Sequence, residues 1–185
     1  RTEASFEEAR AFRAAVTPLA AEERLGAILL QFPYSFPNTE PHRAYISHLR
    51  DILANLPLVV EFRHRSWINE STFEFLRRLE IGFTLIDAPP VTGLAGPIVR
   101  STAPIGYIRF HGRNSEKWWV HEEAYERYNY FYSEEELREW VPRIWSLSKE
   151  VATLFIAFNN HYQAQAVRNA NMLKALLSRQ AAVSR

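Results

Sequence analysis

The sequence of 185 residues contains no cysteine. This absence excludes a disulfide framework, a zinc site built on thiolates and a cysteine nucleophile. No run of about 18 or more apolar residues occurs, so we expect no membrane-spanning helix and no membrane partner. The net charge is only +1, which gives no reason to expect nucleic acid or an anionic membrane as a partner. These features are typical of a cytoplasmic protein, and that is the localisation we expect.

Common sequence motifs of enzyme sites are also absent. The chain has no P-loop, no GxGxxG dinucleotide fingerprint, no GxSxG nucleophile elbow and no EF-hand loop. Ser66 and Ser101 lie in predicted loops without the surroundings of a catalytic triad. A functional site must therefore be sought in the arrangement of the predicted strands.

The length and the 47% hydrophobic content are enough for one domain with a substantial core. We predict a single domain over residues 1–185. The chain begins with Arg1 and has neither an initiator methionine nor the apolar segment of a signal peptide. We therefore expect it to be a fragment of a longer protein.

Apolar segments of strand length alternate with amphipathic patterns along the chain. The predicted strands cover residues 25–32, 58–63, 83–87, 107–113 and 152–160. The predicted helices lie near residues 5–20, 40–55, 70–80, 133–148 and 162–178. In the fourth helix, Ser133 and Glu136 form a capping box, and Pro142 predicts a kink or a break. Nearly continuous apolar strands between helices predict an α/β fold with a parallel sheet covered by helices.

Two architectures fit this pattern. Five strands suit an open, doubly wound sheet, whereas a TIM barrel needs eight and would require three more strands before the first one here. The pattern does not choose between them. In both, functional residues gather at the carboxyl ends of the strands.

Every predicted strand begins apolar and ends in polar or ionisable residues. These terminal residues are Gln31, Glu61, Arg63, His64, Asp87, Arg109, His111, Arg113, Asn114, Asn159, Asn160 and His161. A single polar strand end is commonly just a solvated position, but polar ends on all five strands indicate a site. Side-chain alternation places Arg109, His111 and Arg113 on one face of the fourth strand.

The residue types indicate acid–base chemistry on an anion. Guanidinium groups match carboxylate or phosphate, so we predict that the three arginines at the strand ends bind an anion. Glu61 and Asp87 are candidates for general acid and base, and His111 and His64 suit proton transfer near neutral pH. For Arg63, a salt bridge to either carboxylate is the alternative. No cofactor is assigned, and a divalent metal is a weaker alternative because no metal-binding spacing supports it.

The connection over residues 115–132 is rich in aromatic residues. They are Trp118, Trp119, Tyr125, Tyr128, Tyr130, Phe131 and Tyr132. Such residues beside a polar site either stack on a sugar ring or base, or close over it as a lid. The alternative is that they only pack over the mouth of the fold.

Several linked segments resemble the DUF72 family of YecE-like proteins. They are Leu30-Gln-Phe-Pro33, Glu61-Phe-Arg-His-Arg-Ser-Trp67, Asp87-Ala-Pro89, Arg109-Phe-His-Gly-Arg-Asn114, Arg127-Tyr-Asn-Tyr-Phe-Tyr-Ser133 and Phe158-Asn-Asn-His-Tyr162. The resemblance covers essentially the whole chain. It implies a TIM-barrel-like (β/α) fold of which this chain is the C-terminal two thirds, without the N-terminal strands. It supplies no function, since the family is one of unknown function. Its motif residues repeat the strand-end set apart from Gln31 and add Trp67 and Gly112.

Our first hypothesis is an enzyme of hydrolase or isomerase type that acts on a small anionic or sugar-like substrate. We predict Glu61, His111 and Asp87 as catalytic residues. The predicted substrate-binding residues are Arg63, His64, Trp67, Arg109, Arg113, Asn114, Asn159, Asn160 and His161. The second hypothesis is a non-catalytic binding or scaffold protein whose buried charge network holds the fold together. The third is a binder of single-stranded nucleic acid through the aromatic segment, which the near-zero net charge disfavours. The oligomeric state is left unknown.

Overall fold

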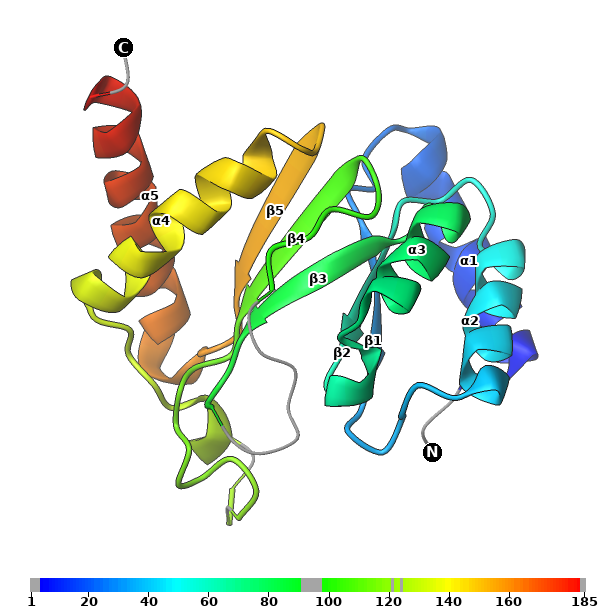
Figure 1. The fold of residues 1–185 in the computed structure, drawn as a ribbon, viewed down its shortest axis with the longest axis horizontal. Helices are drawn as coiled ribbons and strands as arrows, with labels where there is room; N and C mark the ends of the chain where they lie inside the picture. Colours follow the sequence, from blue (N-terminus) through cyan, green and yellow to red (C-terminus); the bar gives the residue numbers. More distant parts are fainter. Residues whose placement is uncertain (1–3, 91–97, 121, 124, 184–185) are drawn as a thin grey trace.

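Five parallel strands form one sheet, and their order in space is their order in the sequence (Figure 1). In this computed structural model, which describes residues 4–90, 98–120, 122–123 and 125–183, all neighbouring strands pair in parallel. The strands are β1 (Ile28–Phe32), β2 (Leu58–Phe62), β3 (Gly82–Asp87), β4 (Ile105–Phe110) and β5 (Thr153–Phe158). Their carboxyl ends therefore meet at one edge, the lower edge in Figure 1.

The strand order decides between the two architectures left open by the sequence. A doubly wound sheet reverses its strand order at a switch point, whereas this order never reverses. Unreversed winding is that of a (β/α) barrel. The sheet is also curved, because Arg109 on β4 reaches across β2 and β3 to β1, where its Nη1 lies 2.7 Å from Oε1 of Gln31.

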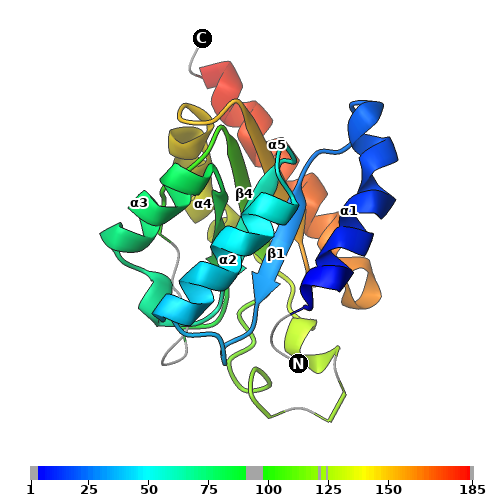
Figure 2. The ribbon, with the colours of Figure 1, turned by 90° about the vertical axis from the view of Figure 1, so that its right-hand side faces the viewer.

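Five α-helices in the described part of the chain accompany the strands. They are α1 (Phe6–Ala21), α2 (Glu40–Ile52), α3 (Glu70–Leu79), α4 (Glu134–Ser148) and α5 (Gln165–Val183). Three short 3-10 helices cover Arg65–Trp67, Glu126–Tyr128 and Tyr162–Ala164. In Figure 2, β1 lies between α1 and α2, and Figure 1 shows α4 and α5 beside β5. None of the described helices is long and apolar enough to cross a membrane.

The predicted alternation of strands and helices is confirmed, with one correction in α4. The capping box is present: the Ser133 hydroxyl accepts from the Glu136 amide, and the Glu136 carboxylate accepts from the Ser133 amide. Of the kink or break expected at Pro142, the break does not occur, because the helix continues to Ser148. Residues on both sides of the proline, Val141 and Ile144, are buried in the core. This packing supports the helix across the missing hydrogen bond.

The two faces of the sheet have different roles. Residues paired in register point the same way, so Gln31 shares a face with Glu61, and Ile86 with Arg109. This inner face carries the polar residues. The outer face lies under the helices and is apolar up to Asp87 at the end of β3: the rings of Phe110 and Trp140 of α4, for example, are 4.9 Å apart.

An aromatic stack fixes the ends of the first two strands. The ring of Phe62 lies 4.1 Å from Trp67 and 5.8 Å from Phe32. Trp67 is fully buried, and its indole Nε1 donates to the Phe36 carbonyl oxygen at 2.8 Å. We had predicted Trp67 as a substrate-binding residue, but the structure places it in the core because its large ring fills the space under these strands.

Gly82 provides a test of the strand packing. A Cβ there would lie 2.5 Å from the carbonyl oxygen of Ile105 and 3.0 Å from Cγ1 of Val59. Because backbone cannot move aside cheaply, we expect Gly82→Ala to lower the free energy of unfolding by about 1–3 kcal/mol, measured by urea denaturation of the full-length protein. Gly26→Ala is the control, since its Cβ would meet only the end of the Phe155 ring. Equal losses in both variants would contradict this account.

Candidate functional site

Glu61 is the centre of a polar cluster on the inner face of the sheet. Its side chain is fully buried at the end of β2. Nη1 of Arg109 donates to its Oε2 at 2.7 Å, and Nε2 of His111 lies 3.2 Å from its Oε1. Arg109 also donates to Gln31, so the cluster joins β1, β2 and the end of β4. A buried carboxylate needs such partners, because water no longer solvates it.

The charges in this cluster follow from its burial and its partners. Burial raises the pKa of Glu61, but the hydrogen bond and charge of His111 and the charges of Arg109 and Arg63 outweigh it and lower that pKa to about 2. Burial is also the largest effect on His111, and together with the two arginines it lowers the pKa of the imidazole against the opposing influence of Glu61. At neutral pH, the cluster therefore holds a carboxylate beside a neutral imidazole.

These protonation states fix the tautomer of His111. An ionised carboxylate only accepts hydrogen bonds, so Nε2 of His111 carries the proton and donates to Glu61. Nδ1 is then left with a lone pair, and Nδ2 of Asn159 lies 3.3 Å from it as the donor. A neutral imidazole with a lone pair on Nδ1 can accept a proton at this nitrogen.

Arg63 joins the cluster to a cavity. Its Nε lies 3.5 Å from Oε1 of Glu61, and the side chain is 15% exposed. This buried Nε has no hydrogen-bond partner among the described residues. Arg63 also lines a cavity of about 330 Å³ together with Tyr34, Trp118, Trp119 and other residues. Arg63 therefore connects the buried Glu61 carboxylate with a space that a small molecule can enter.

The aromatic segment covers this cluster. The ring of Trp118 is buried and lies edge-on to His111 with centroids 6.2 Å apart, and Tyr128 is 6.3 Å from the same imidazole. Trp119 is half exposed beside the cavity. The sequence left open whether these aromatic residues contact a ligand or only pack over the mouth of the fold. Trp118 and Tyr128 pack over the mouth, whereas Trp119 has an exposed ring that a ligand can contact. Residues 121 and 124 of this segment lie outside the described part.

Comparison with known proteins agrees with the expected family. A family model described as "Protein of unknown function DUF72" matches residues 1–185. The chain belongs to the DUF72 family. Among solved structures, a DUF72 family protein from Thermotoga maritima has a TM-score of 0.88 and 40% identity, and covers 93% of this chain. A DUF72 family protein from Enterococcus faecalis has a TM-score of 0.85 at 28% identity and covers 95% of this chain.

The relatives are longer than this DUF72 chain. The match spans 65% of the Thermotoga maritima chain and 67% of the Enterococcus faecalis chain. The UPF0759 protein YunF of Bacillus subtilis is 28% identical over 177 residues, which are 90% of this chain and 63% of that protein. The chain thus spans about two thirds of the length of its relatives, and less in the case of YunF. None of these names states an activity.

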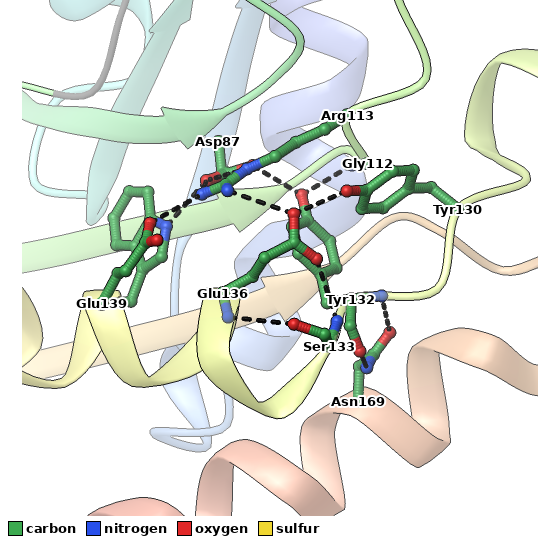
Figure 3. A network of polar contacts seen from close by, with 10 residues as sticks. Asp87, Gly112, Arg113, Tyr130, Tyr132, Ser133, Glu136, Glu139 and Asn169 are labelled. Carbon is green, nitrogen blue, oxygen red and sulfur yellow. Dashed lines mark hydrogen bonds and ion pairs between the residues drawn. The ribbon is translucent and has the colours of Figure 1, made fainter.

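Asp87 of the DUF72 chain lies in a second network, on the other face of the sheet (Figure 3). It pairs in register with Phe110, so it faces the helices. Its two oxygens accept from Nε and Nη2 of Arg113 at 2.9 and 2.7 Å, from the Tyr132 hydroxyl at 2.7 Å and from Nε1 of Trp140 at 2.7 Å. This carboxylate is saturated, and the structure does not bring it to His111 as the prediction of a shared catalytic site required.

Arg113 lies with Asp87 because the chain turns after β4. We expected Arg113 on the same face as Arg109, and that expectation was wrong. The strand ends at Phe110, and Gly112 has a φ of 93°. Residues other than glycine rarely adopt this backbone conformation. This turn breaks the alternation of faces. The hydrogen bond with Asp87 raises the pKa of Arg113, so its positive charge belongs to this pair.

The second network holds the aromatic segment in place. Oε1 of Glu136 accepts from Nη1 of Arg113 at 3.2 Å and from the Tyr130 hydroxyl at 2.6 Å, as Figure 3 shows. The Tyr132 hydroxyl accepts from the Gly112 amide at 2.8 Å. Asn169 of α5 bonds both backbone groups of Tyr132, at 3.2 and 2.8 Å. The strand ends, α4 and α5 are thereby tied to one short stretch of chain.

Four other predicted residues make hydrogen-bond contacts within the loops at this end of the sheet. Nδ2 of Asn114 donates to the Glu126 carbonyl oxygen at 3.1 Å, and Asn160 donates to the Tyr130 carbonyl oxygen at 2.8 Å. Nδ1 of His64 lies 2.8 Å from the Ser66 hydroxyl oxygen. Nδ1 of His161 lies 3.0 Å from the backbone oxygen of its neighbour Asn159. Of the predicted residues, the structure thus gathers Glu61, Arg63, Arg109, His111 and Asn159.

Two residues near the cluster were not predicted. Thr84 pairs in register with Tyr107, and its buried hydroxyl has no hydrogen-bond partner in the described part of the chain. Its position on the inner face could have been found from strand alternation. Tyr34 lines the cavity just after β1, and no pattern in the sequence marks it. No three His, Asp or Glu side chains of the described residues are grouped in a way that could hold a metal ion.

Because all acceptor positions of the Asp87 carboxylate are used within the protein, we predict that this residue stabilises the fold. Asp87→Asn keeps the size of the side chain but leaves Arg113 without its charged partner. We expect the free energy of unfolding to fall by roughly 2–4 kcal/mol, somewhat less than for a fully buried pair because Arg113 is partly exposed. Glu139→Gln is the control, since this exposed residue lies 3.7 Å from Arg113 and its loss should change stability by less than about 0.5 kcal/mol. Equal effects in urea denaturation would refute the assignment.

The lowered pKa of His111 predicts how stability changes with pH. Since the folded state disfavours protonation, acid shifts the equilibrium toward the unfolded state. The contribution of the neutral imidazole is fully present above its unfolded pKa of 6.5 and is lost as the pH falls through the lowered folded value. Glu61 causes a separate loss of stability as the pH falls from its unfolded pKa of 4.5 to its folded pKa of about 2.

We therefore expect the free energy of unfolding to decrease from pH 7 to pH 5, with part of that decrease removed by His111→Gln. Urea denaturation of both proteins at several pH values measures this. Parallel profiles for wild type and variant would show that His111 does not titrate in this way.

Proposed function

We propose that this protein is an enzyme that performs acid–base chemistry, of hydrolase or isomerase type, on a small anionic substrate. The observation that carries the proposal is a buried imidazole hydrogen-bonded to a buried carboxylate, next to an arginine that also lines a cavity. His111, Glu61 and Arg63 provide these three groups at the carboxyl ends of the strands. In (β/α) barrels this is the end at which active sites lie.

His111 is the proton-transfer group in this proposal. Its neutral form accepts a proton at Nδ1, which requires the substrate to take the place of the weak 3.3 Å contact with Asn159. Glu61 holds the imidazole through Nε2 and stabilises the imidazolium that forms. Glu61 is a poor base itself, because its pKa of about 2 leaves it ionised and weakly basic.

Arg63 is the anion-binding group. It reaches from Glu61 to the cavity, and no hydrogen bond to a described residue uses its Nε. Arg109 is different, because Nη1 of its guanidinium is bonded to both Glu61 and Gln31. We therefore assign Arg109 to holding Glu61 ionised, and Asp87 and Arg113 to the stability of the fold. This narrows the predicted catalytic set to His111 with Glu61.

The test is a search for turnover by NMR. The full-length protein is incubated in D₂O with a panel of sugar phosphates, carboxylates and other small anions. Deuterium incorporation reports proton abstraction, and new product signals report hydrolysis. We expect His111→Gln to slow turnover by roughly 10²–10⁴-fold. His48→Gln, at an exposed histidine of α2, should keep it.

Binding at Arg63 without conversion of any compound would make the site a binding site and reject the enzymatic proposal. Unchanged turnover in His111→Gln would reject the role of His111. Thermal unfolding of each variant shows whether a loss comes from unfolding instead.

A further inference from the structure

The cavity beside Arg63 combines positive charge with exposed aromatic surface. Arg63 forms one side, and Arg127 also lines the cavity. The guanidinium of Arg127 lies 5.6 Å from the centre of the Trp118 ring. Among the described residues, Glu61 is the single carboxylate in contact with Arg63, and Arg109 shares it at 2.7 Å. One negative charge is thus divided between two guanidiniums, and an anion in the cavity would find uncompensated positive charge.

The same cavity presents two rings to a ligand. Tyr34 is 39% exposed and Trp119 is 50% exposed, and their centroids are 5.3 Å apart at an interplanar angle of 71°. Tyr34 also contacts His64, whose ring centroid is 4.9 Å away. Rings held at such an angle form a corner in which a flat or ring-shaped group can lie against one face and meet the other edge-on.

The size of the cavity limits the ligand. Its volume of about 330 Å³ is at the lower end of the range for small-molecule sites, which begins at roughly 300 Å³. A small monomer with one charged group fits this volume better than a polymer does. A guanidinium offers a planar set of donors that matches phosphate oxygens, and aromatic faces bind sugar rings and bases by stacking.

We infer that the cavity binds a phosphate monoester of a ring compound, a sugar phosphate or a nucleoside monophosphate. The phosphate lies against Arg63 and the ring lies on Trp119. This inference rests on the proposed function in that it uses the same arginine as the anion-binding group. It adds the substrate class and assigns Trp119 and Tyr34 as residues that select it.

The test is isothermal titration calorimetry of the full-length protein with four probes: inorganic phosphate, ribose 5-phosphate, adenosine monophosphate and adenosine. We expect at least one of the two phosphate monoesters to bind roughly 10-fold or more tightly than inorganic phosphate, because stacking adds to the ionic contact. Adenosine, which lacks the phosphate, should bind more weakly than its monophosphate. A clear preference for adenosine monophosphate assigns the ring site to a base, and equal binding of both monoesters assigns it to the sugar.

Three variants separate the contributions. Trp119→Ala should lower the affinity for the preferred monoester by roughly 10-fold and leave inorganic phosphate within about 2-fold. Arg63→Gln should weaken all phosphate-containing probes. Tyr125→Ala is the control, because this exposed ring of the same segment stacks on Tyr162 with centroids 4.7 Å apart and is not among the residues that line the cavity. Tyr125→Ala should leave the affinity for all four probes unchanged.

The inference is overturned if inorganic phosphate binds as tightly as both monoesters, if Trp119→Ala has no effect on them, or if no probe binds. Failure of the proposed function looks different. If monoesters bind with the expected dependence on Trp119 and Arg63 but no compound is converted, the ligand class stands and the enzymatic proposal falls. If turnover depends on His111 but involves an anion without a ring and ignores Trp119→Ala, the enzymatic proposal stands and the ligand class falls.

Discussion

The burial of the Glu61 carboxylate is the constraint on which the inner face depends. A charge removed from water must be compensated by nearby donors, and here the donors come from Arg109 and His111 at the end of β4. Arg109 can reach Glu61 and Gln31 together only because the sheet is curved. The curved sheet lets Arg109 reach the Glu61 carboxylate, and this carboxylate fixes the tautomer of His111. The tautomer in turn decides which nitrogen of the imidazole can accept a proton.

Two carboxylates at the ends of neighbouring strands have acquired different roles. Glu61 faces the inside, where a titratable imidazole and an arginine that also lines a cavity are its neighbours. Asp87 faces the helices, where an arginine, a tyrosine and a tryptophan use all of its acceptor capacity. The turn at Gly112 separates the two environments by sending His111 to one side and Arg113 to the other. The second network also holds the segment whose aromatic rings cover the first.

Much of the fold could be predicted from the sequence. Apolar runs of strand length and the capping box at Ser133 depend on local pattern, and all five strands and five helices are present. The strand-end rule likewise pointed to Glu61 and His111. It did not show that Asp87 and Arg113 lie on the other face of the sheet, because side chains alternate between faces only while the chain stays extended. It also could not reveal that Trp67 fills the core, since an aromatic residue beside a polar motif has the same sequence signature in either place.

The sequence alone determined the alternation of strands and helices, the family, and the polar character of the carboxyl ends, because each of these depends on neighbouring residues and on short linked motifs. The tertiary structure decided the unreversed strand order, the assignment of each charged residue to one face, and the cavity between Arg63 and Trp119. These features depend on contacts between residues far apart in the chain: Arg109 meets Gln31 and Tyr132 meets Asp87 only when the sheet has curved and the segment after β4 has folded back. Local pattern carries no information about which of several arginines will line a cavity.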